Sequence, residues 1–277
     1  MKPKWLLEKE VFEESEDMIK EIHSQGMEVH CIGSLDPFSG KLIDNQIESC
    51  VIVRGSLNVV RQLLREQTQW IPGGWCDLDN FKCSKYFTYY GEHLINKDYV
   101  MMPMQEVIRQ KDLLLKLFGK DNKIFVRPDS GFKPFTGKIL RADEINLEGF
   151  EYGFYYEDLS TMVVISSPKN IQAEWRFVVA EKEVISGCIY QSQNIGIKEA
   201  ESYTDAARDY AKKIVLQDWQ PEIIYTIDIC LSDKKLYVLE LNAFSTSGLY
   251  VCDLKPIVKK ASELAIMEWN EFHEQEK

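Results

Sequence analysis

The stretch from Tyr225 to Tyr250, YTIDICLSDKKLYVLELNAFSTSGLY, constrains the fold of this chain most. Apolar residues alternate with other residues in TIDICLS and again in KLYVLELN, and a strand turns its side chains to opposite faces at each step. The polar run SDKK between these segments is typical of a turn. The stretch therefore predicts two strands joined as a hairpin.

The register of this hairpin decides which polar side chains lie together. If the apolar rows share one face, Asp228 shares the other face with Glu240 and Asn242, and this needs an odd loop of three or five residues. A loop of two or four residues would place Asp228 on the face of Leu239, and one-residue slips are costly where a face is buried. We therefore expect an odd loop.

Two carboxylates and an amide oxygen would then share one face, and Mg²⁺ prefers oxygen ligands of this kind. The pattern alone leaves an alternative open, because any antiparallel hairpin with a solvated face shows the same polar alternation.

Composition limits the classes of partner. The chain has 277 residues, of which 45% are hydrophobic and 28% charged, so a globular protein is expected. The net charge of −11 argues against nucleic acid as a partner, since such binding needs clustered cations. A small anionic ligand stays possible, because a few focused cations suffice.

Cysteine usage and apolar runs indicate the compartment. The seven cysteines have no CxxC spacing and the four histidines form no HExxH motif, which favours reduced thiols over a zinc site. The first 17 residues turn acidic too soon for a signal peptide. No apolar run approaches the roughly 18 residues of a membrane span. These features favour a cytoplasmic protein with no membrane partner.

Residues 1–100 predict a small α/β lobe. The apolar strand SCVIVR at 49–54 is followed by Gly55 and by a helix from about 58 to 67. The absence of GxGxxG argues against a dinucleotide site here. The segment WIPGGW at 70–75 reads as a turn between aromatic residues.

The segment KIFVRPDSGFKPFTGKIL at 123–140 carries most of the positive charge relevant to a ligand. Arg127 ends a predicted strand, and Lys133 and Lys138 flank a glycine-containing loop. Glycine allows close approach of the backbone, and exposed N–H groups in such loops bind anions. The alternative is a hairpin tip kept soluble by lysines.

The later segments predict further strands and helices. MVVI at 162–165 is a short apolar strand, QAEWRFVV at 172–179 places Glu174 and Arg176 on one face, and EVISGCIYQ at 183–191 is its hairpin partner. Helices are expected at 202–217 and 254–274.

In this order, the segments VRPDSGFKPFTG (126–137), AEWRFVV (173–179) and the Asp228…Glu240-Leu241-Asn242 hairpin resemble the ATP-grasp superfamily, and within it the R2K clade. The resemblance covers about residues 100–250. It implies an α+β fold in which residues 1–100 form a pre-ATP-grasp lobe. Residues 101–167 and 168–277 would form two subdomains that hold ATP between them.

The resemblance also assigns roles to individual residues. Asp228, Glu240 and Asn242 take the positions of the magnesium ligands, and Arg127 stands where most members have a phosphate-binding lysine. Lys133 and Arg176 correspond to the lysine and second arginine of the clade and are the candidate catalytic residues. The candidate ATP-binding residues are Arg127, Ser130, Lys133, Lys138, Val164, Ile165, Ser166, Glu174 and Arg176.

Besides the arginine at position 127, the hinge departs from the usual pattern. Ser166 and Ser167 hold the adenine hinge where a ribose-binding glutamate is usual, so Glu174 is the nearest candidate for that contact. We expect Arg127 to lie beside the three metal-ligand candidates despite the distance along the chain.

The activity implied is an ATP- and Mg²⁺-dependent ligase that joins a carboxylate to an amine through an acyl phosphate. Its substrates would be small molecules or peptides. Three alternatives remain: a nucleotide-binding or phosphotransferase protein of the same fold, an interaction protein with an acidic surface, and a nucleic-acid ligase. The last would need a nucleophilic lysine in a KxDG-type motif, and the sequence contains none.

Overall fold

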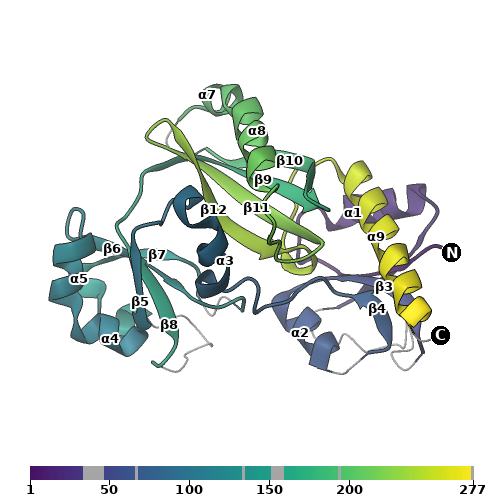
Figure 1. Cartoon of the computed structure of the whole chain (residues 1–277), viewed down its shortest axis with the longest axis horizontal. Coiled ribbons are helices and arrows are strands. Elements are labelled where there is room, and N and C mark those ends of the chain that lie inside the picture. Colours follow the sequence, from purple (N-terminus) through teal and green to yellow (C-terminus); the bar gives the residue numbers. More distant parts are fainter. Residues whose placement is uncertain (34–46, 66–67, 133–134, 151–158, 193–194, 276–277) are drawn as a thin grey trace.

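The computed structural model describes residues 1–33, 47–65, 68–132, 135–150, 159–192 and 195–275. Lys133 therefore lies outside the described residues. Within them, three four-stranded sheets and the helices that cover them form an α+β protein (Figure 1). The fold class predicted from the sequence is confirmed.

The first sheet is parallel, with the strand order β2-β1-β3-β4. Its strands are β1 (Lys4–Glu8), β2 (Glu28–Ile32), β3 (Ser49–Arg54) and β4 (Trp70–Gly73), with helices α1 (Ser15–Ser24) and α2 (Leu57–Arg65) between them. The predicted turn at WIPGGW is wrong, because Trp70–Gly73 pairs with β3 as the edge strand. Pro72 is tolerated there, since an edge strand needs partners on one side only.

The second sheet has the order β5-β8-β6-β7 and is antiparallel throughout. It consists of β5 (Tyr99–Pro103), β6 (Lys123–Pro128), β7 (Lys138–Arg141) and β8 (Met162–Ser166). Helices α4 (Met104–Arg109), α5 (Lys111–Phe118) and α6 (Leu147–Phe150) belong to the same part of the chain. A separate apolar core, which includes Val107, Leu114 and Val126, lies between this sheet and its helices.

The third sheet, β10-β9-β11-β12, is also antiparallel and lies centrally in the molecule (Figure 1). Its strands are β9 (Ile171–Ala180), β10 (Glu183–Gln191), β11 (Ile224–Ser232) and β12 (Lys235–Ala243). Helix α8 (Thr204–Ile214), which follows α7 (Ile197–Ser202), packs against β9, β10 and β11, and α3 (Cys83–Tyr90) lies between this sheet and the second sheet. Trp175 and Phe177 are fully buried in its core, which fits the predicted alternation along β9.

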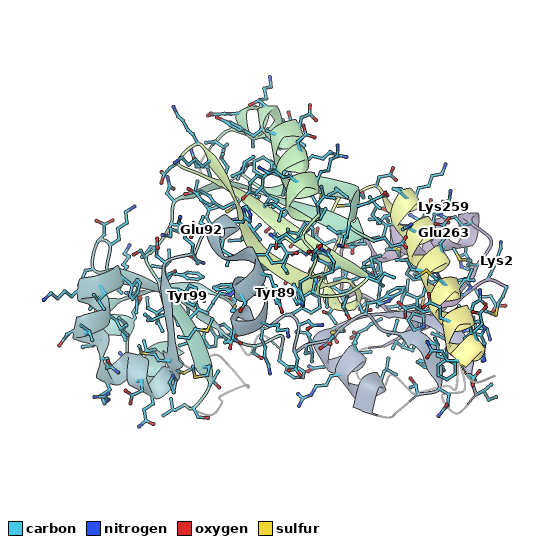
Figure 2. All side chains as sticks on the ribbon, viewed as in Figure 1. Lys2, Tyr89, Glu92, Tyr99, Lys259 and Glu263 are labelled. Atoms are coloured by element: carbon cyan, nitrogen blue, oxygen red, sulfur yellow. The ribbon has the colours of Figure 1, made fainter. Side chains whose placement is uncertain are left out.

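Helix α9 (Leu254–Gln275) returns from the third sheet to the first, where it contacts α1, β3 and β4. Its Ile257, Val258 and Ala261 are buried, whereas Lys259 and Glu263 form an ion pair on its exposed side (Figure 2). The helix also contacts β9 and β10, so it packs between the first sheet and the third sheet. The division at residues 100 and 167 stays a prediction.

Within the described part of the chain, no helix is both long enough and apolar enough to cross a membrane.

Candidate active site

The β11–β12 hairpin brings the predicted metal ligands together by a route that differs from the predicted one. Ser232 pairs with Lys235, so the loop has two residues, Asp233 and Lys234, both with positive φ (49° and 62°). The prediction of an odd loop is therefore wrong. Farther along, Asp228 pairs with Glu240 but Ile229 pairs with Val238, which leaves Leu239 as an extra residue in a β-bulge. The bulge reverses the one-residue offset of the loop.

As a result, Asp228 shares a face with Glu240 and Asn242, as predicted. The Asn242 amide Nδ2 donates to Glu240 Oε1 at 3.0 Å and to Asp228 Oδ2 at 3.4 Å. Asp228 is fully buried and Asn242 nearly so, whereas Glu240 is partly exposed. Two acid side chains thus face a common polar hydrogen-bond donor in a sheltered place.

Arg176 holds the other side of Asp228. The two residues are direct cross-strand partners in β9 and β11, and the guanidinium donates from Nε and Nη2 to the two carboxylate oxygens at 2.8 and 2.7 Å. Burial disfavours the charged guanidinium, but the nearby Asp228 and Glu240 carboxylates outweigh this and raise the pKa of Arg176. Arg176 therefore stays cationic, and this bidentate contact fixes its orientation.

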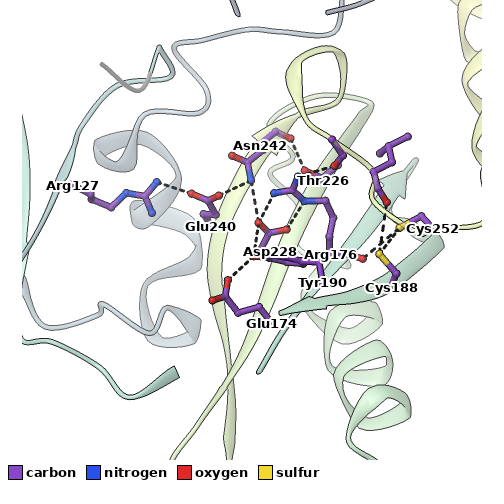
Figure 3. Close-up of polar contacts among 12 residues, drawn as sticks. Arg127, Glu174, Arg176, Cys188, Tyr190, Thr226, Asp228, Glu240, Asn242 and Cys252 are labelled. Carbon is purple, nitrogen blue, oxygen red and sulfur yellow. Dashed lines mark hydrogen bonds and ion pairs between the residues drawn. The ribbon is translucent and has the colours of Figure 1, made fainter. Parts of the chain in front are cut away.

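Arg127 reaches the same face from the second sheet. It lies near the end of β6, and its Nη2 donates to Glu240 Oε2 at 3.0 Å (Figure 3). The predicted convergence of Arg127 with the three metal-ligand candidates is confirmed. Its buried Nε has no hydrogen-bond partner among the described residues. The guanidinium brings a positive charge to this face, which suits an anionic ligand such as phosphate.

Tyr190 completes this cluster, and sequence reasoning missed it. Its hydroxyl donates to Glu174 Oε2 at 2.6 Å and lies 3.4 Å from Asp228 Oδ2. Burial raises the pKa of Glu174, and the bond from Tyr190 only partly opposes this shift. A bulge in β10 between Ile189 and Gln191 shifts the register at Tyr190, so simple alternation along the strand gave no signal for it.

The other predicted ATP-binding residues lie around the second sheet. Ser130 Oγ accepts the Phe132 N–H at 3.1 Å, and Lys138 in β7 donates to the Gly149 carbonyl. Val164, Ile165 and Ser166 are fully buried in β8, where Ser166 Oγ donates to Asn96 Oδ1 at 3.0 Å. The side chains of these three hinge residues are thus engaged in the protein interior. Their backbone lies in an interior strand, which pairs with β5 on one side and with β6 on the other.

The Gly131 turn packs closely against the first lobe. A Cβ at this position would lie 2.4 Å from the Leu78 carbonyl oxygen, so only glycine fits without movement of the backbone. This contact places the glycine-containing loop beside a cavity of about 140 Å³. The cavity is lined by Leu57, Leu78, Phe81, Gly131, Arg176, Leu241, Asn242, Ala243, Thr246, Ser247 and Gly248.

Segment 244–249 supplies Thr246, Ser247 and Gly248 to the cavity wall. Two buried charged residues of the first lobe, which sequence reasoning also missed, hold this segment. Arg54 donates to the carbonyls of Phe244 and Ser247 at 2.9 and 2.7 Å, and Glu14 accepts the Leu249 N–H at 2.7 Å. Arg54 and Glu14 also pair with each other at 3.3 Å. Neither is part of a recognisable motif, and their chain positions give no sign that they meet this loop.

The donor set suits magnesium. Asp228 and Glu240 present carboxylate oxygens on one face, and turning the Asn242 amide by 180° would replace its nitrogen with an oxygen. Asn242 Nδ2 now contacts both the Asp228 and the Glu240 carboxylate, and a cation bound between these carboxylates would contact the same two groups. Among the described residues no group of three His, Cys, Asp or Glu side chains could hold a metal ion.

Comparison with solved structures shows the same fold at low sequence identity. D-cycloserine synthetase DcsG superimposes with a TM-score of 0.58 at 11% identity, over 95% of this chain and 99% of that one. The ATP-grasp ligase PsnB, complexed with a minimal precursor, gives 0.54 at 14% identity, over 96% and 100%. D-alanine–D-alanine ligase from Bacillus anthracis complexed with ATP gives 0.53 at 15% identity, over the full length of both chains. These likenesses establish the fold.

No curated protein matches the chain in sequence. A family model does match, over residues 105–260, and its description is ATP-grasp domain, R2K clade family 2. The match spans more than half of the chain and includes Arg127, Arg176 and the Asp228, Glu240 and Asn242 face. This protein is therefore a member of the R2K clade of the ATP-grasp proteins, within its family 2.

Proposed function

We propose that the protein is an ATP- and Mg²⁺-dependent ligase that joins a carboxylate to an amine through an acyl phosphate. The observation that carries this proposal is the meeting of Arg127 and Arg176 with Asp228, Glu240 and Asn242 on one face of the third sheet. Two guanidinium groups and two carboxylates within hydrogen-bonding contact suit a ligand that combines a polyphosphate with a divalent cation.

In this proposal ATP lies between the second and third sheets. Arg127 holds phosphate oxygens, and Lys133, Lys138 and the Ser130 turn complete the phosphate contacts. Val164, Ile165 and Ser166 are kept as the candidates for the adenine hinge, although β8 pairs with β5 and β6 on its two sides. Glu174 is kept as the candidate for the ribose, although its carboxylate already accepts the Tyr190 hydroxyl. Mg²⁺, when bound by Asp228, Glu240 and Asn242, offsets phosphate charge during transfer.

The reaction has two steps. A carboxylate oxygen attacks the γ-phosphorus of ATP, and the bond from this phosphorus to the bridging oxygen breaks and releases ADP. An amine then attacks the acyl carbon, phosphate leaves, and the amine nitrogen loses a proton. Arg176 lies on the cavity wall, where its charge would stabilise the transferred phosphoryl group and the acyl phosphate. Lys133 would act with it, as the resemblance implies.

The cavity next to Arg176 supports a small molecule or a peptide end as the carboxylate substrate. Its lining combines the polar side chains of Arg176 and Asn242 with the apolar side chains of Leu57, Leu78 and Phe81. A carboxylate facing the guanidinium would place the rest of the substrate against these apolar side chains. Burial of apolar area contributes about 25 cal/mol per Å² to such binding.

Trapping with hydroxylamine tests this function without knowledge of the natural amine. The protein is incubated with Mg-ATP, hydroxylamine and pools of carboxylates, and hydroxamates and ADP are measured by mass spectrometry. ADP release that depends on one pool, with a matching hydroxamate, is expected, and EDTA should abolish both. A carboxylate labelled with ¹⁸O should pass one labelled oxygen to phosphate. A stable phosphorylated product instead would indicate a phosphotransferase and would overturn the ligase proposal.

A further inference from the structure

Two cysteines that are 64 positions apart in the chain meet directly behind Arg176. The Sγ atoms of Cys188 in β10 and Cys252 before α9 lie 3.2 Å apart, and both thiols are free. A disulfide bond is about 2.0 Å long, so a shift of roughly 1 Å would join them. This is the one contact between cysteines among the seven, all of which lie in the described part of the chain.

The pair is sheltered but close to the surface. Cys188 and Cys252 are nearly buried, whereas the neighbouring Val251 is 80% exposed. The hydrogen bond donated by Cys252 lowers the pKa of the Cys188 thiol, and the same contact raises that of Cys252. A small oxidant that reaches Val251 would thus meet one thiol prone to ionise and a second thiol in contact with it.

Each of the two cysteines is connected to Arg176 by a contact of its own (Figure 3). Cys188 is the cross-strand partner of Arg176, and Cys252 Sγ lies 3.9 Å from the Arg176 carbonyl oxygen. The segment 248–252 that leads into Cys252 begins with the Gly248 carbonyl, which accepts from Arg176 Nη1 at 2.7 Å. A movement of Cys252 therefore acts on a contact of Arg176.

The same segment also carries an aromatic support for the guanidinium. The Tyr250 ring stacks on Tyr190 with 4.7 Å between centroids, and the Arg176 guanidinium lies 5.0 Å from the Tyr250 centroid. Tyr250 has a φ of 52°, in the left-handed region, so its backbone is already constrained. A single residue, Val251, separates the oxidisable Cys252 from Tyr250.

We propose that Cys188 and Cys252 are an oxidation site that closes to a disulfide and thereby pulls segment 248–252 against β10 and displaces Arg176. The oxidant is a hydroperoxide. The Cys188 thiolate attacks the O–O bond, forms a sulfenic acid and releases hydroxide, or an alkoxide from an organic peroxide, which takes up a proton. The Cys252 thiol then attacks the sulfenic sulfur and releases water. Two thiols lose two electrons, and hydrogen peroxide becomes two waters.

The first test maps the disulfide in the wild-type protein and needs no ligase activity. The protein is treated with graded hydrogen peroxide, free thiols are alkylated, and the digest is analysed before and after reduction. The expected result is a Cys188–Cys252 linked peptide as the first product, with Cys31, the least buried of the cysteines, still reduced. The unfolding temperature should rise by several degrees, because the bond closes a long loop, and should return with dithiothreitol.

Single variants sharpen the test. Cys188→Ser and Cys252→Ser should each lose the linked peptide and the rise in unfolding temperature, while Cys31→Ser should keep both. The proposal is overturned if the oxidised wild-type protein shows other linkages first, or only sulfinic and sulfonic acids. This mapping remains decisive even if a serine variant fails to fold.

The effect on Arg176 rests on the proposed function and has its own readout. In the hydroxylamine assay, oxidised wild-type protein should turn over at least tenfold more slowly than reduced protein, with recovery on reduction, and Cys252→Ser should be insensitive to peroxide. Unchanged turnover in fully disulfide-linked protein would overturn the link to Arg176. Absence of turnover in the reduced protein would instead count against the proposed function, and the mapped disulfide would stand.

Discussion

Arg176 and Asp228 face each other across neighbouring strands, and both guanidinium–carboxylate hydrogen bonds are under 2.9 Å. Asp228 is fully buried and Arg176 nearly so. This pairing gives Asp228 two roles. Asp228 is a candidate metal ligand and also the counter-charge that allows Arg176 to be buried, so removing it affects stability and activity together.

Asp228 and Glu240 should thus respond differently to substitution. Glu240→Gln should lower Mg-ATP turnover by about 10²-fold or more, because a charged contact in the site is lost, while the protein stays folded because Glu240 is partly exposed. Asp228→Ala should lose turnover and also destabilise the protein by about 3–5 kcal/mol, since it leaves a buried guanidinium unpaired. Urea unfolding beside turnover assays separates the two effects, with Glu263→Gln on α9 as the control. Normal turnover in Glu240→Gln would remove the metal assignment.

Arg127 should contribute mainly to binding of ATP. Arg127→Ala removes the guanidinium that lies beside Glu240. Hydrogen bonds to charged groups contribute about 1.5–3 kcal/mol each, so the affinity for ATP should fall about 10- to 100-fold. Titration calorimetry with Mg-ATP measures this. Arg109→Ala, which removes an exposed ion pair with Glu106, is the matched control and should bind as the wild type does. Equal affinity in both variants would contradict the phosphate role of Arg127.

The sequence predicted the strands of the third sheet and the shared face of Asp228 and Glu240. It did so because apolar and polar residues alternate strongly along β9, β11 and β12. It did not predict how the face is achieved. The bulge at Leu239 and the two-residue loop are backbone conformations, and alternation counted from residue types cannot distinguish an odd loop from an even loop with a bulge.

The parts that sequence reasoning missed depend on contacts between distant segments. β1 is buried and too short to show a period, and the Trp70–Gly73 strand contains proline and glycine, which usually mark turns. Tyr190, Arg54 and Glu14 matter because of residues far along the chain that they touch. A single sequence contains no record of such pairs.

The tight hairpin turn gives a stability prediction. Asp233 and Lys234 both have left-handed backbone, where a residue other than glycine pays about 1–2 kcal/mol. Lys234→Gly should therefore stabilise the protein by about 1 kcal/mol, since the two-residue loop then has the residue type that such turns favour. Urea unfolding measures the change, and Lys235→Gly, one position later in β12, should destabilise. A destabilised Lys234→Gly would show that the lysine side chain matters more than the backbone.

Arg54 should set the shape of the cavity wall. Arg54→Lys keeps the buried charge opposite Glu14 but loses the forked contact with the Phe244 and Ser247 carbonyls. We expect KM for the carboxylate to rise about tenfold, with ATP affinity unchanged, because Arg54 touches the 244–249 wall and not Arg127. Steady-state kinetics measures KM for the carboxylate, and calorimetry measures the affinity for ATP. Arg141→Lys on the exposed side of β7 is the control, and an equal loss of ATP affinity in Arg54→Lys would indicate general destabilisation instead.

Glu222 predicts how stability depends on pH. One carboxylate oxygen accepts the Asp77 N–H at 2.8 Å, and the other is buried without a hydrogen-bond partner among the described residues. Burial, and then the nearby Asp77 and Glu268 carboxylates, raise the pKa of Glu222 well above its ordinary value of 4.5. The folded protein therefore holds a proton that the unfolded chain releases.

The sign of the effect follows from this difference in bound protons. Above pH 4.5 the unfolded state binds fewer protons than the folded state, so the free energy of unfolding should fall as pH rises. The slope is up to about 1.4 kcal/mol per pH unit, and it ends once the pH has passed the pKa of Glu222 in the folded protein. Glu222→Gln keeps the acceptor for Asp77 and cannot ionise, so it should flatten this slope and be more stable than the wild type near pH 8. Urea unfolding between pH 5 and 8, with the exposed Glu201→Gln as control, measures it. Parallel pH profiles for Glu222→Gln and the wild type would show that Glu222 is ionised in the folded protein.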